Sequence, residues 1–241
     1  MTLVMGLFLL GAGLAGFVSG LVGFAFALVA APIWLRVLDP LEVIGLVVCF
    51  GVLTQGYALW NMRREIDLRP SLPFIAGGLV GVPLGVWIVR SLDPHAFQFA
   101  IGIFMIAYTG FLLLRPDNGG RIRGGGRPAD AGIGFVSGVL GGMTGFSGPI
   151  VTLWCALRPW NKYEQRQAYQ PYLLVMHLTT IASLAAAGTL EWRTGEMFLI
   201  GTPIVVAGLW AGFRLYRLVD DQAYRRIVLW LLLASGFSLL W

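Results

Sequence analysis

The 241-residue chain is 57% hydrophobic and only 12% charged, with a mean hydropathy of +0.78. A water-soluble domain carries about 25% charged residues, so this composition predicts an integral membrane protein and excludes a soluble enzyme or a disordered chain. The formal net charge of +5 does not indicate nucleic-acid binding, because the basic residues lie at the ends of apolar stretches and not on one soluble face.

The charged residues are confined to short clusters that leave eight charge-free stretches. About 20 apolar residues cross a bilayer as an α-helix, which satisfies its own backbone hydrogen bonds. An outer-membrane barrel would instead show segments of about ten residues with alternating polarity. We therefore predict an all-α integral membrane protein with about eight to ten helical segments. In chain order the stretches are 2–35, 43–62, 70–89, 96–114, 131–157, 167–190, 197–213 and 227–241.

The lysines and arginines between the stretches indicate the topology, because positive residues accumulate on the cytoplasmic side of short loops. If every stretch crosses the membrane once, the two sides receive eight and nine of these residues, which is no bias. If residues 131–157 enter and leave on the same side, the counts become 14 and 3. The second distribution favours a hairpin of two short half-helices around the glycine-rich bend at 141–149.

The two halves of the chain resemble each other. The pentapeptide at 16–20, Gly-Phe-Val-Ser-Gly, recurs unchanged at 134–138. On this alignment Gly23 matches Gly141, Pro32 matches Pro149, and Gly81, Gly85 and Asp93 match Gly208, Gly212 and Asp220. With the charge assignment the halves run in opposite directions, so we predict two inverted repeats, 1–115 and 131–241, joined by a cytoplasmic Gly/Arg-rich linker at 116–130. Each repeat would contain one broken, re-entrant hairpin and three transmembrane helices.

Glycine-rich, proline-broken segments at matching positions of two halves point to the binding site of a transporter. A broken helix exposes backbone N–H groups, and the positive end of a half-helix attracts an anion. The second bend adds two hydroxyls, whereas the run at 23–27 offers backbone alone. The alternative is that the glycines only permit close helix packing. The predicted substrate-binding residues are Gly141, Gly142, Thr144, Gly145, Ser147, Gly148 and Pro149, with Gly23, Phe24 and Pro32 in the first half.

Four further polar residues extend this candidate site. Arg166 begins a long apolar stretch and either pairs with the anion or anchors the helix at the cytoplasmic surface. Gln55 and Gln170 either line the transport path or hydrogen-bond to a neighbouring helix. His177 is the intramembrane group that titrates near neutral pH, which makes it either a candidate for proton coupling or a packed histidine.

The sequence gives less support to a protease, to a metal or cofactor protein, or to a channel. The sequence at 145–148, Gly-Phe-Ser-Gly, has the G-x-S-G form of rhomboid-type intramembrane proteases, but Pro149 would interrupt the helix directly after the serine. No metal-binding, phosphate-binding or dinucleotide-binding motif is present, so we expect no metal, no cofactor and no enzyme activity. An anion channel or pore is the alternative to a carrier.

Together these motifs resemble the TauE/SafE family, the sulfite exporters and 4-toluene-sulfonate uptake proteins, along almost the whole chain. The resemblance rests on residues 20–24 with 27–32, on 81–85 with 92–94, on 134–142 and on 145–149. The run at 165–167, Gln-Arg-Gln, departs from the F-R-A run of the family. The resemblance implies a multi-pass inner-membrane transporter of a small sulfur-containing anion such as sulfite, sulfoacetate or another organosulfonate. The expected partners are this anion and the lipid bilayer, for a monomer or a homodimer.

Overall fold

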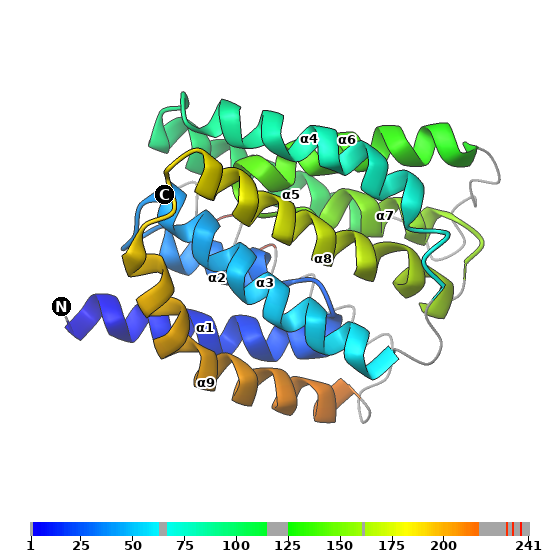
Figure 1. Ribbon diagram of the computed structural model, residues 1–241. Helices are drawn as coiled ribbons and strands as arrows, with labels where there is room; N and C mark the ends of the chain where they lie inside the picture. The colour runs from blue at the N-terminus through cyan, green and yellow to red at the C-terminus, as the bar shows by residue number, and fades with distance from the viewer. Residues whose placement is uncertain are drawn as a thin grey trace. The chain divides into compact units, whose positions relative to one another are not determined.

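The computed structural model describes residues 2–62, 67–114, 125–160 and 162–216, with single helical residues at 230, 233 and 237. Within these ranges the regular structure is entirely α-helical, which confirms the predicted fold class. Asp220 and most of the predicted stretch 227–241 lie outside the described residues. The helices drawn in Figure 1 are α1 (Thr2–Val22), α2 (Phe26–Trp34), α3 (Pro40–Met62), α4 (Leu72–Val89), α5 (Pro94–Leu114), α6 (Gly126–Thr144), α7 (Pro149–Leu157), α8 (Lys162–Ala186) and α9 (Trp192–Tyr216).

The helices differ in whether they are long enough to cross a membrane. Among the described residues, four helices contain a stretch long and apolar enough to cross a membrane, and these are α1, α3, α4 and α9. By contrast, α2 and α7 have nine residues each. At 1.5 Å per residue, nine residues extend about 14 Å, roughly half of the hydrocarbon core of a bilayer. Each half-length helix directly follows a longer one.

Each hairpin has one long arm and one short arm, whereas we predicted two short half-helices. The first arm has 21 residues in α1 and 19 in α6, so it extends about 30 Å before the short helix returns. The second of these arms begins at Gly126, inside the segment predicted as a linker, and residues 116–124 lie outside the described ranges. The predicted bends are present, but the arm before each bend is longer than expected.

The chain forms two compact units. Unit 1 comprises residues 1–50, 92–116 and 190–241, and unit 2 comprises residues 51–91 and 117–189. Unit 1 therefore contains α1, α2, α5, α9 and the first part of α3, whereas unit 2 contains α4, α6, α7, α8 and the remainder of α3. Each unit thus combines a bent hairpin from one half of the sequence with a long helix from the other half.

In unit 1, α1 and α2 form an antiparallel hairpin around Gly23. This glycine has a φ of 91°, a left-handed conformation that costs glycine little, and its N–H donates to Ser19 O at 2.7 Å. At the far end of α2, Trp34 Nε1 donates to Phe8 O at 3.0 Å. Because the end of α2 lies beside the first half of α1, the chain enters and leaves this hairpin at the same end.

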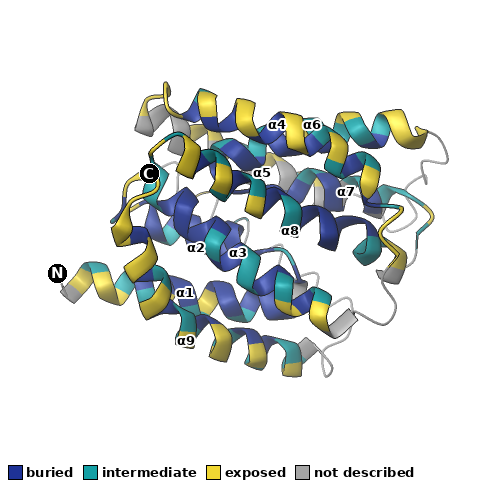
Figure 2. Ribbon diagram, in the orientation of Figure 1, coloured by how far each residue is buried: buried dark blue, intermediate teal, exposed yellow. Residues whose placement is uncertain are grey.

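Trp34 is the centre of the aromatic core of unit 1. Its side chain is fully buried, and its ring centroid lies 5.2 Å from Phe8, 5.9 Å from Phe26 and 5.9 Å from Phe50. Figure 2 shows that α2 is buried along almost its whole length. Aromatic pairs at such distances contribute about 0.5–1.5 kcal/mol beyond the burial of their area. The short helix is therefore held by α1 and α3 together.

In unit 2, α6 and α7 form a second antiparallel hairpin, around Gly145. Gly145 has a φ of 78°, and its N–H donates to Gly141 O at 2.7 Å. The far end of α7 returns to the start of α6, where Trp154 Nε1 donates to Asp130 Oδ1 at 2.8 Å. The chain therefore enters and leaves this hairpin at one end, as the arginine distribution predicts for residues 131–157.

Glycine-lined seams join each hairpin to the long helix of the other half. In unit 1, a Cβ added to Gly16 would lie 2.6 Å from Val205 O in α9. In unit 2, a Cβ added to Gly138 would lie 2.7 Å from Gly78 O in α4. Figure 1 shows α1 beside α9 and α4 beside α6. Small residues allow membrane helices to approach at backbone distance, so the glycines of the repeated pentapeptide serve close packing.

The equivalent positions of the two hairpins differ from the sequence alignment by one helical turn, whereas the match of Gly81 with Gly208 agrees with the contacts of these residues. The bend glycines Gly23 and Gly145 are 122 residues apart, and so are the first residues of α3 and α8. The repeated pentapeptides, however, are 118 residues apart. The alignment of Gly23 with Gly141 is therefore wrong by four residues, and Gly145 is the structural counterpart.

Replacing Gly138 with alanine should separate α4 from α6, because the new methyl group would meet Gly78 O. We expect the free energy of unfolding to fall by about 1–3 kcal/mol, measured as a lower midpoint in thermal unfolding of the detergent-purified protein. Gly132→Ala is the matched control, since nothing lies within 4 Å of a Cβ at this position of the same helix. Equal midpoints for the two variants would contradict the seam.

Candidate functional site

The hydroxyl of Thr144 closes the bend between α6 and α7. Its Oγ1 accepts a hydrogen bond from Phe146 N at 2.9 Å and donates to Leu140 O at 2.7 Å. Because the hydroxyl hydrogen is used within the helix, none is left for an anion. The structure gives Thr144 the role of fixing the bend, and contact with a substrate stays a prediction for this residue.

A second hydroxyl holds the other side of the bend. Ser137 is fully buried in α6 and donates from Oγ to Ser147 O at 2.7 Å. Proline then begins α7 at position 149, where a missing N–H costs nothing, and Thr152 N donates to Gly148 O at 2.9 Å. The bend therefore has a fixed backbone course that leads directly into the first turn of α7.

The first turn of α7 presents backbone N–H groups at the bend. The first N–H groups of an α-helix have no carbonyl partner within the helix, and no side chain caps α7. They carry the positive end of the helix dipole, equivalent to roughly half an elementary charge. Since Pro149 has no N–H, the donors here belong to Ile150 and Val151. The bend meets the backbone requirement for binding an anion.

Ser147 contributes a buried hydroxyl without a hydrogen-bond partner in the described part of the chain. The residue is fully buried, and its Oγ lies against Gly141, where a Cβ would overlap it. Only glycine at 141 leaves this space to the hydroxyl. An unsatisfied buried polar group costs about 1–3 kcal/mol, so a ligand that accepts the hydrogen of Ser147 would be stabilised here.

His177 reaches the same bend from α8. Its side chain is 6% exposed, and the imidazole lies beside the backbone of Gly51 in α3 and of Gly145 in the bend. A Cβ on Gly51 would lie 2.5 Å from Nδ1, so glycine at 51 makes room for the ring. Within the described ranges Nδ1 has no hydrogen-bond partner. Among the described residues, the Ser147 hydroxyl thus lacks a hydrogen-bond partner beside the bend, and His177 Nδ1 makes no hydrogen bond of good geometry although the imidazole lies against the backbone of Gly51 and Gly145.

The two predicted glutamines are both buried, at 2% exposure for Gln55 and 1% for Gln170. Gln55 lies one turn after Gly51 on the same face of α3, which brings it to the neighbourhood of the histidine. Gln170 precedes His177 by two turns, about 10 Å along α8. Counted from the first residues of α3 and α8, Gln55 and His177 occupy equivalent positions.

Arg166 lies far from the bend along α8. Eleven residues separate it from His177, which corresponds to about 16 Å of helix. The neighbouring Gln167 accepts a hydrogen bond at its carbonyl oxygen from Ser71 Oγ at 2.7 Å, next to the start of α4. The structure places Arg166 one turn before Gln170 and away from the bend, and its contact with a substrate stays a prediction.

The corresponding bend of unit 1 differs in its chemistry. Phe24 is partly buried beside the left-handed Gly23, and Pro32 lies inside α2, six residues after its start, whereas Pro149 begins α7. The run at 23–27 contains no hydroxyl side chain. Ser19, one turn before Gly23, is 2% exposed, and its Oγ has no partner among the described residues. Its place in the repeated pentapeptide was the signal that could have found it.

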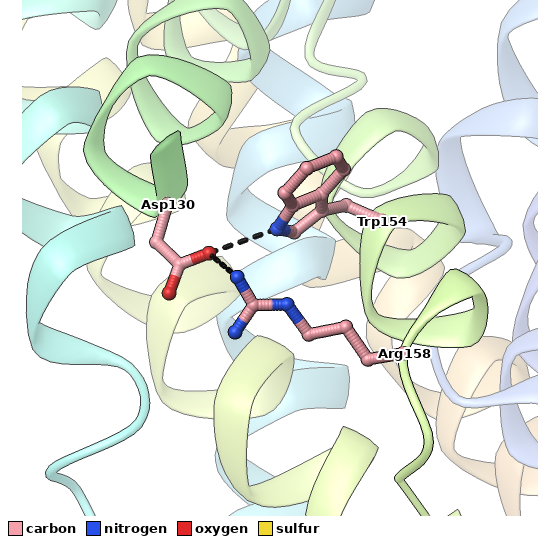
Figure 3. A network of polar contacts seen from close by, with 3 residues as sticks. All are labelled: Asp130, Trp154 and Arg158. Carbon is pink, nitrogen blue, oxygen red and sulfur yellow. Dashed lines mark hydrogen bonds and ion pairs between the residues drawn. The ribbon is translucent and has the colours of Figure 1, made fainter. Parts of the chain in front are cut away.

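A polar network ties the two ends of the second hairpin together (Figure 3). Asp130, in the second turn of α6, pairs with Arg158 at the end of α7 and accepts the hydrogen bond from Trp154. The guanidinium also lies 5.4 Å from the ring of Trp154 and 4.8 Å from that of Trp160, in cation–π geometry. Arg158 therefore contacts residues at the ends of the hairpin, about 14 Å along α7 from the bend.

Comparisons with known proteins identify the family of this chain. Residues 7–239 match the family described as "Sulfite exporter TauE/SafE". The chain is 32% identical over 177 residues to "Probable inner membrane transporter protein TsaS" from Comamonas testosteroni, and the match covers 73% of each chain. No solved structure matches. These findings confirm the resemblance drawn from the sequence.

Thr144→Val should destabilise the protein more than Ser147→Ala. Valine keeps the shape of threonine but removes two hydrogen bonds, so we expect a loss of about 1–3 kcal/mol, measured by thermal unfolding without substrate. Ser147→Ala removes a hydroxyl that bonds to nothing in the described structure, so its midpoint should stay at or above that of the parent protein. A loss for Ser147→Ala as large as that for Thr144→Val would show that this hydroxyl is structural.

Proposed function

The chain belongs to the TauE/SafE family of membrane transporters, and from this membership we propose that it carries a small sulfur-containing anion across the inner membrane. Sulfite, sulfoacetate and other organosulfonates are the proposed class of substrate. The bend between α6 and α7 is the proposed substrate site. The observation that carries this assignment is the buried Ser147 Oγ, which has no hydrogen-bond partner among the described residues and lies beside the first turn of a half-length helix, with the imidazole of His177 at the same bend.

The chemistry of the bend suits an oxyanion. The first N–H groups of α7 and the Ser147 hydroxyl can each donate to one oxygen of a sulfonate or sulfite group. The imidazole of His177 can donate as well, in the tautomer that carries its hydrogen on Nδ1. Gly141, Gly142, Gly145 and Gly148 leave the backbone accessible at this point, and Thr144 and Ser137 fix its course.

We further propose that transport occurs by alternating access between two inverted repeats. In support, each unit contains the same bent hairpin, with a left-handed glycine between a long helix and a nine-residue helix. Discontinuous helices at matching positions of two repeats are typical of secondary transporters that bind substrate between the repeats. His177 is the candidate for coupling transport to protons, because histidine is the side chain that titrates near neutral pH.

The competing functions make different demands on the same residues. A channel would use the bend to coordinate a passing ion and would not need to change conformation in each cycle. An intramembrane serine protease needs a base hydrogen-bonded to its serine, and Ser147 Oγ and His177 Nδ1 make no such bond to each other. A carrier is the function that this geometry and the family support best.

Counterflow in proteoliposomes tests the proposed function. Vesicles loaded with unlabelled sulfite or sulfoacetate should take up the labelled anion faster than empty vesicles. The reason is that a carrier with bound substrate reorients across the membrane faster than an empty carrier. Ser147→Ala should lower this uptake at least tenfold at subsaturating substrate, if the hydroxyl contributes about 1.4 kcal/mol to binding.

Two controls accompany the counterflow experiment. Ser91→Ala removes a hydroxyl from an exposed position after α4 and should leave uptake unchanged. Each variant is compared at equal amounts of reconstituted, folded protein. Uptake that is equal in loaded and empty vesicles would identify a channel, and unimpaired counterflow by Ser147→Ala would remove the bend as the site.

A further inference from the structure

The proposed substrate site lies among helix segments that carry no charged side chain. In unit 2, residues 51–62, 72–89, 131–157 and 167–190 contain no Asp, Glu, Lys or Arg. The described charged residues of the unit lie at the ends of its helices or between them: Asp67, Arg69, Arg90, Arg127, Asp130, Arg158, Lys162, Glu164 and Arg166. The buried polar groups identified at the bend are therefore uncharged.

Helix geometry keeps Arg158 and Arg166 away from the bend, and Arg90 at the end of α4 is the nearer cation. Arg158 follows Pro149 by about 14 Å of helix and is paired with Asp130. Arg166 precedes His177 by about 16 Å. Arg90 is exposed and lies five residues, about 7 Å, beyond Gly85, the residue of α4 that packs against the end of α6. None of these guanidinium groups belongs to the buried polar groups at the bend.

The positive potential at the bend comes from dipoles. The N-terminus of α7 supplies roughly half an elementary charge, and Ser147 and His177 add neutral hydrogen-bond donors. The cost of taking an ion out of water rises with the square of its charge and is already several kcal/mol for a single charge. Half a positive charge with two or three neutral donors therefore suits one negative charge and leaves a second one uncompensated.

We propose that this bend selects its substrate by the charge of the group that it holds, binding a sulfonate or hydrogensulfite group with one negative charge and rejecting a group of the same size with two. Sulfate, thiosulfate and fully deprotonated sulfite carry two charges on one group. Sulfoacetate carries its second charge on a separate carboxylate, which would lie outside the bend. This inference rests on the proposed function and adds a property that the family match does not contain. It follows from the distribution of charge in unit 2 together with the buried Ser147 hydroxyl, which has no hydrogen-bond partner in the described part of the chain.

Methanesulfonate and sulfate form the matched pair for a test, because they share a tetrahedral SO₃ group and differ by a methyl group in place of one charged oxygen. Both are titrated into the purified full-length protein at about pH 8, where an ordinary imidazole is neutral, and the unfolding midpoint is recorded. Sulfate also stabilises proteins without binding to a site. The quantity compared is therefore the midpoint shift of the parent protein minus that of Ser147→Ala.

We expect a saturable, Ser147-dependent shift with methanesulfonate, half-complete at a concentration at least tenfold lower than any such shift with sulfate. Gly141→Ala, which displaces the Ser147 hydroxyl, should abolish the same shift and serves as the second variant. A sulfate shift that depends on Ser147 at similar concentrations would overturn charge selection and leave the site in place. If neither anion gives a shift that depends on Ser147 or on Gly141, the site itself is wrong, and the charge inference falls with it.

Discussion

The close packing of glycine backbones is the interaction on which the rest of this structure depends. In a bilayer, apolar side chains gain little by leaving lipid for a neighbouring helix, so helices associate where their backbones can approach. Gly16 and Gly20 provide this approach between α1 and α9, and Gly134 and Gly138 provide it between α6 and α4. Both seams join a helix of one sequence half to a helix of the other. A compact unit can therefore form only when both halves of the chain are present.

The α4–α6 seam determines what the second bend can do. It holds the long arm of the hairpin in place up to Gly142, and Asp130 with Arg158 ties the far end of α7 back to the start of α6. Between these two attachments, the hydroxyls of Ser137 and Thr144 satisfy the turning backbone. Such a fixed bend can keep the Ser147 hydroxyl without a partner, because the chain is not free to relax toward one. The unsatisfied donor is thereby available to a ligand.

Composition and charge placement predicted the helical fold, and the glycine-rich runs predicted both bends, because these features depend on local sequence. The role of His177 stays a prediction. The register between the two hairpins was wrong by one turn, since Gly134, Gly138 and Gly142 recur every four residues and a shift by one turn keeps glycine opposite glycine. The roles of Ser137 and Asp130 depend on partners that only the folded hairpin supplies. The sequence does not reveal which hydroxyl group donates its hydrogen to an acceptor within the protein. In the described structure Thr144 donates to Leu140 O, whereas Ser147 has no acceptor.

The most direct test of the central claim, that the second bend holds the transported anion, is an experimental structure with bound 2-bromoethanesulfonate. The bromine locates the ligand independently of the density for the protein. The account predicts the sulfonate beside Ser147 and the first turn of α7, with the imidazole of His177 on its other side. A ligand found at Arg158 or Arg166, with the bend unoccupied, would contradict the account.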